Sequence, residues 1–179
     1  MNKILTAALL TTLAMPAIAH AEVSDSLPSG LGVKHVVTIA APTAKVYASL
    51  LKVGRWWNPE HSYSKQAANL SLTARPGGCF CEKLANGGGA VHSTVTRVEP
   101  GSLLIMVGGL GPLAGAGVTG AMTWALEAVD AKTTKLTMTY NVGGYLQGGL
   151  ATMAAPVDKV LGEQVARLKT FVETGKPTS

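Results

Sequence analysis

The fold is decided between residues 122 and 140, which read MTWALEAVDAKTTKLTMTY. Toward both ends of this stretch every second residue is apolar or aromatic: Met122, Trp124, Leu126, Leu136, Met138 and Tyr140. Successive side chains of a strand point to opposite faces, so the two ends predict neighbouring strands that each have one apolar face. We expect these six side chains to lie in the core.

Other segments rich in β-branched or apolar residues are separated by turn residues. Together with the two neighbouring strands just described, the predicted strands are residues 33–40, 70–74, 79–84, 90–98, 102–107, 118–129 and 135–142. Turns rich in glycine, proline and asparagine separate them at residues 76–78, 86–89 and 99–101. This alternation is typical of hairpins in an antiparallel sheet.

Two amphipathic helices accompany the predicted strands. Pro42 sits where the first turn of a helix tolerates proline, and apolar residues follow it at helical spacing until Gly54. After a glycine-rich link at residues 143–149, apolar residues recur at helical spacing between charged ones, at Val157, Val160 or Leu161, Val165, Leu168 and Val172. This pattern predicts a long C-terminal helix.

The N-terminus has the pattern of a signal peptide. Lys3 precedes an uncharged run, and Ala-His-Ala at residues 19–21 provides a cleavage site before Glu22. The run is about twelve residues, shorter than the roughly eighteen of a spanning helix. We expect a signal peptide at residues 1–21, a flexible lead at 22–32 and one domain at 33–175, in a periplasmic or secreted protein.

Composition argues against a nucleic-acid partner and against a membrane span. The chain has a net charge of +5, but its Lys and Arg residues are scattered without a basic stripe. Residues 102–126 carry no charge and are long enough to cross a membrane, but six glycines and Pro112 interrupt them. Two buried strands around a glycine-rich loop fit this segment better, so we expect no span in the mature chain.

The order of elements resembles that of the START-like or SRPBCC superfamily of polyketide cyclase/dehydrase and lipid-transport proteins. Ala41-Pro42 resembles its strand-to-helix step, Trp56-Trp57 its tryptophan step, and residues 72–84 one of its hairpins. The resemblance covers residues 33–173. It implies an α+β helix-grip fold, in which a curved antiparallel sheet of about seven strands wraps around the C-terminal helix and encloses an apolar cavity. No catalytic residues are shared across that superfamily.

Cys79 and Cys81 leave three interpretations open. They are two thiols facing the core or cavity, a redox-active disulfide, or metal ligands together with Glu82, His92 and His61. Residues two apart in a strand are separated by about 6.6 Å, near the outer limit for a disulfide. The spacing of the possible ligands matches no standard site, and we expect neither a metal nor another cofactor.

These observations favour a periplasmic binding or carrier protein for a small hydrophobic molecule, held between the sheet and the C-terminal helix. The residues expected to contact it are Trp57, His61, Met106, Met122, Trp124, Met138, Tyr140, Met153 and Val157. The alternative is a cyclase-like or redox enzyme that uses the same cavity with Cys79 and Cys81 and with His61 and His92. A third hypothesis is a filled cavity, with the protein acting through its surface. Common hydrolase and nucleotide-binding motifs are absent, and the oligomeric state is left open.

Overall fold

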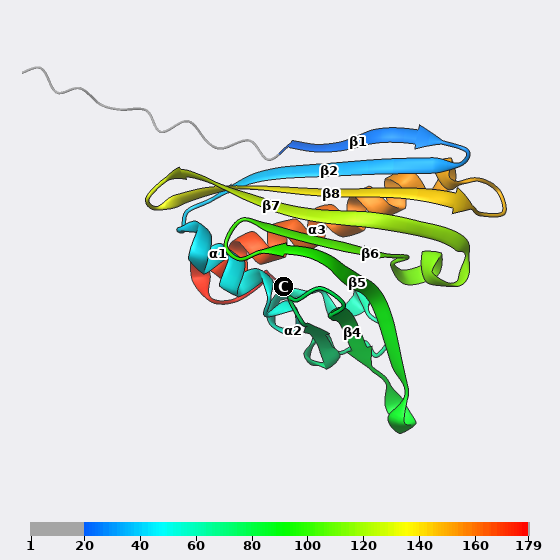
Figure 1. The fold of residues 1–179 in the computed structure, drawn as a ribbon, viewed down its shortest axis with the longest axis horizontal. Coiled ribbons are helices and arrows are strands. Elements are labelled where there is room, and N and C mark those ends of the chain that lie inside the picture. The colour runs from blue at the N-terminus through cyan, green and yellow to red at the C-terminus, as the bar shows by residue number, and fades with distance from the viewer. Residues whose placement is uncertain (1–19, 179) are drawn as a thin grey trace, which may run out of the picture.

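The computed structural model describes residues 20–178, which form one eight-stranded antiparallel sheet with helices against it (Figure 1). The strands are β1 (His20–Leu27), β2 (Gly30–Ile39), β3 (Leu70–Leu72), β4 (Cys79–Lys83), β5 (Gly89–Glu99), β6 (Leu103–Gly108), β7 (Gly117–Asp130) and β8 (Thr133–Tyr145). Their order across the sheet is β1-β2-β8-β7-β6-β5-β4-β3. The predicted α+β helix-grip class is confirmed, with eight strands where the sequence predicts about seven.

The additional strand is β1, at one edge of the sheet. Residues 22–27 belong to this strand and β2 begins at Gly30, so the structure differs here from the expected flexible lead. Residues 22–27 are all exposed, and β1 is held by backbone pairing with β2. A strand without a buried face lacks the alternating pattern that would reveal it in a sequence. Residues 1–19, most of the predicted signal peptide, lie outside the described residues.

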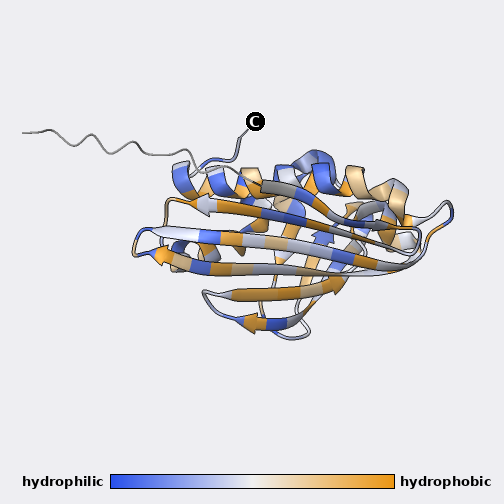
Figure 2. Ribbon diagram, turned by 90° about the horizontal axis from the view of Figure 1, so that it is seen from above, coloured by the Kyte–Doolittle hydropathy of each residue, from blue (hydrophilic) through white to orange (hydrophobic). Residues whose placement is uncertain are grey.

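The core lies between the sheet and α3 (Ala154–Thr174), which packs against β1 and β2 and runs behind β7 and β8 in Figure 1. Figure 2 shows the alternation of polar and apolar residues along the strands. The six residues predicted for the core are all buried, none with more than 5% of its surface exposed: Met122, Trp124, Leu126, Leu136, Met138 and Tyr140. This prediction is confirmed.

The first helical segment is divided in two. α1 (Thr43–Leu50) ends before the predicted stop at Gly54, which lies inside a second short helix, α2 (Val53–Trp56). A Cβ atom at position 54 would lie 2.8 Å from the carbonyl oxygen of Leu70, so glycine allows α2 to approach the start of β3. The indole N–H of Trp56 donates to the carbonyl of Ser49 at 3.1 Å and fixes α2 against α1.

The long uncharged segment forms β6, the 3-10 helix η4 (Gly111–Gly115) and β7. The prediction of two strands around a glycine-rich loop is therefore confirmed. Within residues 20–178, no helix has both the length and the apolar character needed to cross a membrane.

A buried histidine and a half-buried aspartate join the sheet to α3. His35 Nε2 on β2 lies 3.0 Å from Asp158 Oδ1 on α3. Burial lowers the pKa of His35, and the Asp158 carboxylate offsets only part of that effect. The imidazole is therefore neutral at pH 7, and His35 acts as a packing group between β2 and α3.

Candidate functional site

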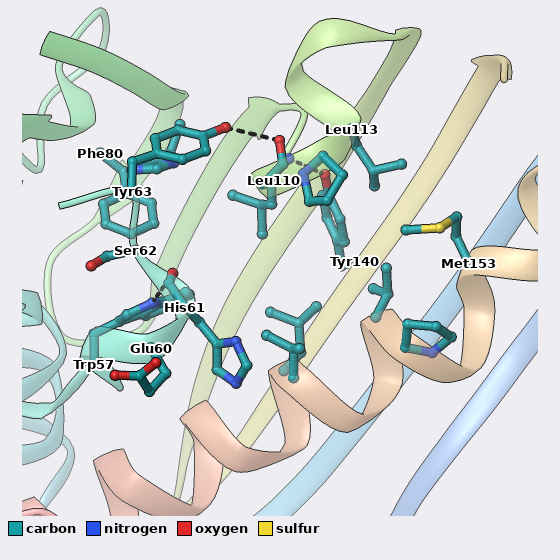
Figure 3. Close-up of a pocket in the computed structure, with 17 residues that line it drawn as sticks. Trp57, Glu60, His61, Ser62, Tyr63, Phe80, Leu110, Leu113, Tyr140 and Met153 are labelled. Atoms are coloured by element: carbon teal, nitrogen blue, oxygen red, sulfur yellow. Dashed lines mark hydrogen bonds between the residues drawn. The ribbon is translucent and has the colours of Figure 1, made fainter. Parts of the chain in front are cut away.

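A cavity of about 350 Å³ lies between the sheet and the first turns of α3 (Figure 3). We call it the pocket. One wall of the pocket comes from α3 and from the residue that precedes this helix. This wall is wholly apolar and consists of Met153, Pro156, Val157, Val160 and Leu161. Leu110 and Leu113, in the loop between β6 and β7, lie on another side. Such a lining favours an apolar occupant.

Tyr140 of β8 ties the β6–β7 loop to the sheet. Its hydroxyl donates a hydrogen bond to the carbonyl of Gly108 at 2.8 Å and accepts one from the Leu110 amide at 3.2 Å. Burial raises the pKa of Tyr140 to about 12, so the hydroxyl stays neutral. A Cβ atom at Gly120 would lie 2.4 Å from the Tyr140 ring, so glycine on β7 makes room for the ring.

One group of polar side chains at the pocket lies on the side of β4 and β5. Glu82 of β4 is 2% exposed, and its carboxylate lies 2.9 Å from His92 Nε2 on β5. The same carboxylate accepts hydrogen bonds from the backbone amides of Tyr63, at 3.1 Å, and Ser64. One buried carboxylate therefore holds together β4, β5 and the segment around Tyr63.

Hydrogen bonding keeps Glu82 ionised despite its burial. Burial by itself raises the pKa of this carboxyl, but the hydrogen bonds from Ser64 and from its other donors outweigh burial and hold the pKa below its usual value. His92 lines the pocket, so this side combines an imidazole with a supporting carboxylate.

Tyr63 covers His92 and reaches across to the β6–β7 loop. The two rings are stacked, with centroids 5.3 Å apart. The Tyr63 hydroxyl donates to the carbonyl of Gly111 at 2.8 Å, as Figure 3 shows. This bond joins two segments far apart in the sequence at the exposed side of the pocket.

Trp57 and His61, together with Glu60 and Ser62, add further polar groups to the lining. The Trp57 indole N–H donates to the carbonyl of His61 at 3.0 Å, and His61 Nε2 lies 3.1 Å from Glu163 Oε2 on α3. Phe80 packs edge-on against Trp57, with ring centroids 5.2 Å apart. Trp56 points instead into the core, where it is 1% exposed.

The predicted contact residues fall into two groups. Five line the pocket: Trp57, His61, Tyr140, Met153 and Val157. Four are in the closed core: Met106, Met122, Trp124 and Met138, each at most 3% exposed. The first three of these surround only a gap of about 10 Å³.

Several pocket residues were not predicted as ligand contacts. Val160 and Leu161 belong to the apolar stripe of the C-terminal helix, which is a usable signal. Tyr63, Phe80 and the loop at 110–113 have no such signal, because their contribution depends on how distant segments meet.

The cysteines form a disulfide, as in one of the three interpretations, and the redox activity of this disulfide stays a prediction. Phe80 and Glu82 of the same strand are buried inward, whereas Cys79 and Cys81 alternate with them and lie half-buried on the opposite face. The bridge is thus on the far side of the strand from the pocket. Across residues 20–178, no three His, Cys, Asp or Glu side chains are grouped to hold a metal.

Comparisons with known proteins give a family and a fold. A family model described as polyketide cyclase / dehydrase and lipid transport matches residues 31–173. No curated protein matches the chain.

Solved structures share the fold at low sequence identity. A conserved protein of unknown function from Enterococcus faecalis is 13% identical, with a TM-score of 0.58 over 89% of this chain and 80% of its own. CalU16 from Micromonospora echinospora is 15% identical, with a TM-score of 0.54 over 92% and 88%. The di-domain ARO/CYC protein BexL of the BE-7585A biosynthetic pathway is 22% identical, with a TM-score of 0.58 over 79% of this chain and 46% of its own.

Proposed function

Because the chain belongs to the polyketide cyclase / dehydrase and lipid transport family, we propose that it is a binding or carrier protein for a small apolar molecule. The observation that supports this proposal best is the pocket of about 350 Å³, with a wholly apolar wall from α3 and a few polar groups on the opposite side. Ligand sites of proteins commonly combine these features, since apolar contact supplies affinity and polar groups fix orientation. The volume is at the small end of such sites.

The polar groups indicate how the molecule would be oriented. His61 lies on the side of Trp57 and Phe80, whereas Met153 and Leu113 lie at the other end (Figure 3). His92 packs against Phe80, with ring centroids 4.9 Å apart. An apolar molecule with one polar substituent would place that substituent beside the imidazoles. Burial of its apolar part would contribute roughly 25 cal/mol per Å².

We also propose that this carrier acts outside the cytoplasm, on the basis of the signal-peptide pattern at residues 1–21. Fractionation of bacteria that express the full chain, followed by intact mass measurement, tests this. A mature protein that begins at Glu22 in the periplasm or medium is expected. A full-length protein retained in the cytoplasm would contradict the proposed location.

Filling the pocket is expected to prevent binding. Val157 is half-buried and lines the pocket from α3, so an indole at this position can occupy the cavity without displacing the closed core. The Val157→Trp variant should bind the apolar fluorophore N-phenyl-1-naphthylamine at least about tenfold more weakly, a loss of about 1.4 kcal/mol. A fluorescence titration measures this.

The matched control is Lys159→Trp, which adds the same side chain at an exposed position of the same helix. It should leave the dissociation constant unchanged. Equal binding by the wild-type protein and both variants would show that the fluorophore does not use the pocket, and no binding by the wild type would reject the proposed carrier function.

The Glu82–His92 pair supports a second candidate, a cyclase-like enzyme. A carboxylate that orients an imidazole is a common arrangement for general acid–base catalysis, and His92 lines the pocket. Native mass spectrometry of the purified protein, with extraction of any bound molecule, separates the two candidates. A carrier releases the molecule with its mass and structure unchanged, whereas an enzyme converts it on incubation.

A further inference from the structure

The disulfide lies where a small thiol can reach it. Cys79 and Cys81 are the only cysteines of the chain, are half-buried, and lie on the outer face of β4. Their cross-strand neighbours on this face, Ser71 on β3 and Val91 on β5, are exposed. The bridge is therefore covered neither by a helix nor by the core.

The bridge coincides with an irregularity in the sheet. The Cα atoms of Cys79 and Cys81 are 5.4 Å apart, whereas residues two apart in a regular strand are separated by about 6.6 Å. The register between β4 and β5 shifts at the same place, because Phe80 pairs with Ser93 and Cys81 with Val91. The extra residue of this bulge is His92. Bulges commonly redirect a side chain, and here the bulged residue faces the pocket.

The inner face of the bridged segment forms one wall of the pocket. Phe80 lies between the two cysteines, lines the pocket, and packs against Trp57 and against His92, with ring centroids 5.2 and 4.9 Å apart. Glu82 follows Cys81 and holds His92 and the Tyr63 amide. A change in the spacing of Cys79 and Cys81 therefore acts directly on the side chains that line the pocket.

We propose that Cys79 and Cys81 form a reversible thiol–disulfide site that controls the pocket from the opposite face of β4. The proposal rests on the proposed binding function, since the pocket is what the bridge regulates. With the bridge closed, β4 is shortened and the bulge presents His92 beside Phe80. With the bridge open, β4 is released toward regular spacing, and the wall formed by Phe80, His92 and Tyr63 is no longer held in place.

The exchange needs a thiol reductant, for which a small dithiol suffices. One thiolate of the dithiol attacks a cysteine sulfur, breaks the Cys79–Cys81 bond and forms a mixed disulfide. Its second thiol then attacks the mixed disulfide and releases the protein. Two electrons and two protons pass to the protein, whose cysteines become thiols, while the dithiol becomes a cyclic disulfide.

The experiment measures redox state and binding on the same samples of mature protein. One aliquot of each dithiothreitol-treated or untreated sample is alkylated with iodoacetamide and weighed intact, and two added groups report an open bridge. Binding of N-phenyl-1-naphthylamine is titrated on a second aliquot that has not been alkylated. Opening the bridge should weaken binding at least about fivefold, the lower end of common coupling between two sites. Reoxidation with oxidised glutathione should restore it.

The Cys79→Ser/Cys81→Ser double variant controls for the reductant. It should bind like the reduced wild type, with and without dithiothreitol, and circular dichroism should show that it keeps its fold. Equal affinities of the oxidised and reduced wild type would overturn the proposal, as would a bridge that millimolar dithiothreitol leaves intact in the folded protein.

A separate readout distinguishes this proposal from the carrier function. Trp57 packs against Phe80, so opening the bridge should change the tryptophan fluorescence of the wild type but not of the double variant. Absence of fluorophore binding by the oxidised protein would reject the carrier function alone. Unchanged tryptophan fluorescence on reduction would then reject the redox coupling.

Discussion

Trp124→Ala is expected to lower the free energy of unfolding by about 3–5 kcal/mol, the usual cost of removing a large buried aromatic side chain. Trp124 is 1% exposed, and its ring lies edge-on to Trp56 with centroids 6.1 Å apart. The variant loses this contact and leaves a cavity at the centre of the sheet. Since domains are commonly stable by about 5–15 kcal/mol, the loss is a large fraction of the total. Urea denaturation followed by circular dichroism measures it.

Val129→Ala is the matched control for this prediction. Val129 is on the same strand but 61% exposed, so its truncation should change stability by no more than about 0.5 kcal/mol. Similar losses in the two variants would contradict the placement of Trp124 in the core.

The second large effect is expected for Glu82→Ala, which should lower the free energy of unfolding by about 3 kcal/mol at pH 7. The change removes a buried acceptor and leaves the amides of Tyr63 and Ser64 and the imidazole of His92 without their partner. Hydrogen bonds to a charged group contribute about 1.5–3 kcal/mol each, and water entering the vacated space recovers part of the loss. Urea denaturation at pH 7 measures the difference from the wild type.

The same variant has a characteristic pH dependence. The pKa of Glu82 is lower in the folded protein than in the unfolded chain, so this group contributes its full stabilisation above about pH 4.5 and loses it as the pH falls through the folded value. The stability difference between wild type and Glu82→Ala should therefore shrink below pH 4.5. The pKa of Glu173 is also lowered by folding, but Glu173 is present in both proteins and cancels in the comparison.

Glu82→Gln is the control for charge. It keeps one oxygen that can accept a hydrogen bond from an amide, so it should be less destabilised than Glu82→Ala. A difference between wild type and Glu82→Ala that stays constant down to pH 3 would show that the carboxylate charge does not contribute.

The sequence predicts the core well because, in a strand with one buried face, the alternation of apolar residues follows directly from which side chains are buried. Met122 and Leu136 belong to strands that are buried on one face only, so their alternation directly reports the fold. Strand β1 has no buried face between residues 22 and 27, and no periodic signal marked it.

The candidate site was only partly predictable. Periodicity identified Val157 and Tyr140 as inward-facing, and both line the pocket. It equally identified Met122 and Trp124, which lie in the closed core, because a periodic pattern cannot distinguish a filled interior from a cavity. That difference depends on the volume left between α3 and the β6–β7 loop, which is a property of the whole fold.

The state of Cys79 and Cys81 was left open for a related reason. A regular strand places the two residues near the limit for a disulfide, and the structure joins them through local shortening at a bulge. The bulge arises from the pairing of β4 with β5, which the sequence of β4 alone does not contain.

The hydrogen bond from Tyr63 to Gly111 gives the pocket a kinetic property separate from its affinity. A molecule that enters or leaves past the Tyr63 ring must break this bond, and the bond re-forms once the passage is complete. Breaking it raises the barriers to association and dissociation equally, by about 0.5–1.5 kcal/mol. For a bound molecule of the proposed kind, the residence time would therefore be set partly by a contact that the molecule itself does not make, and exchange can be slow even where binding is weak.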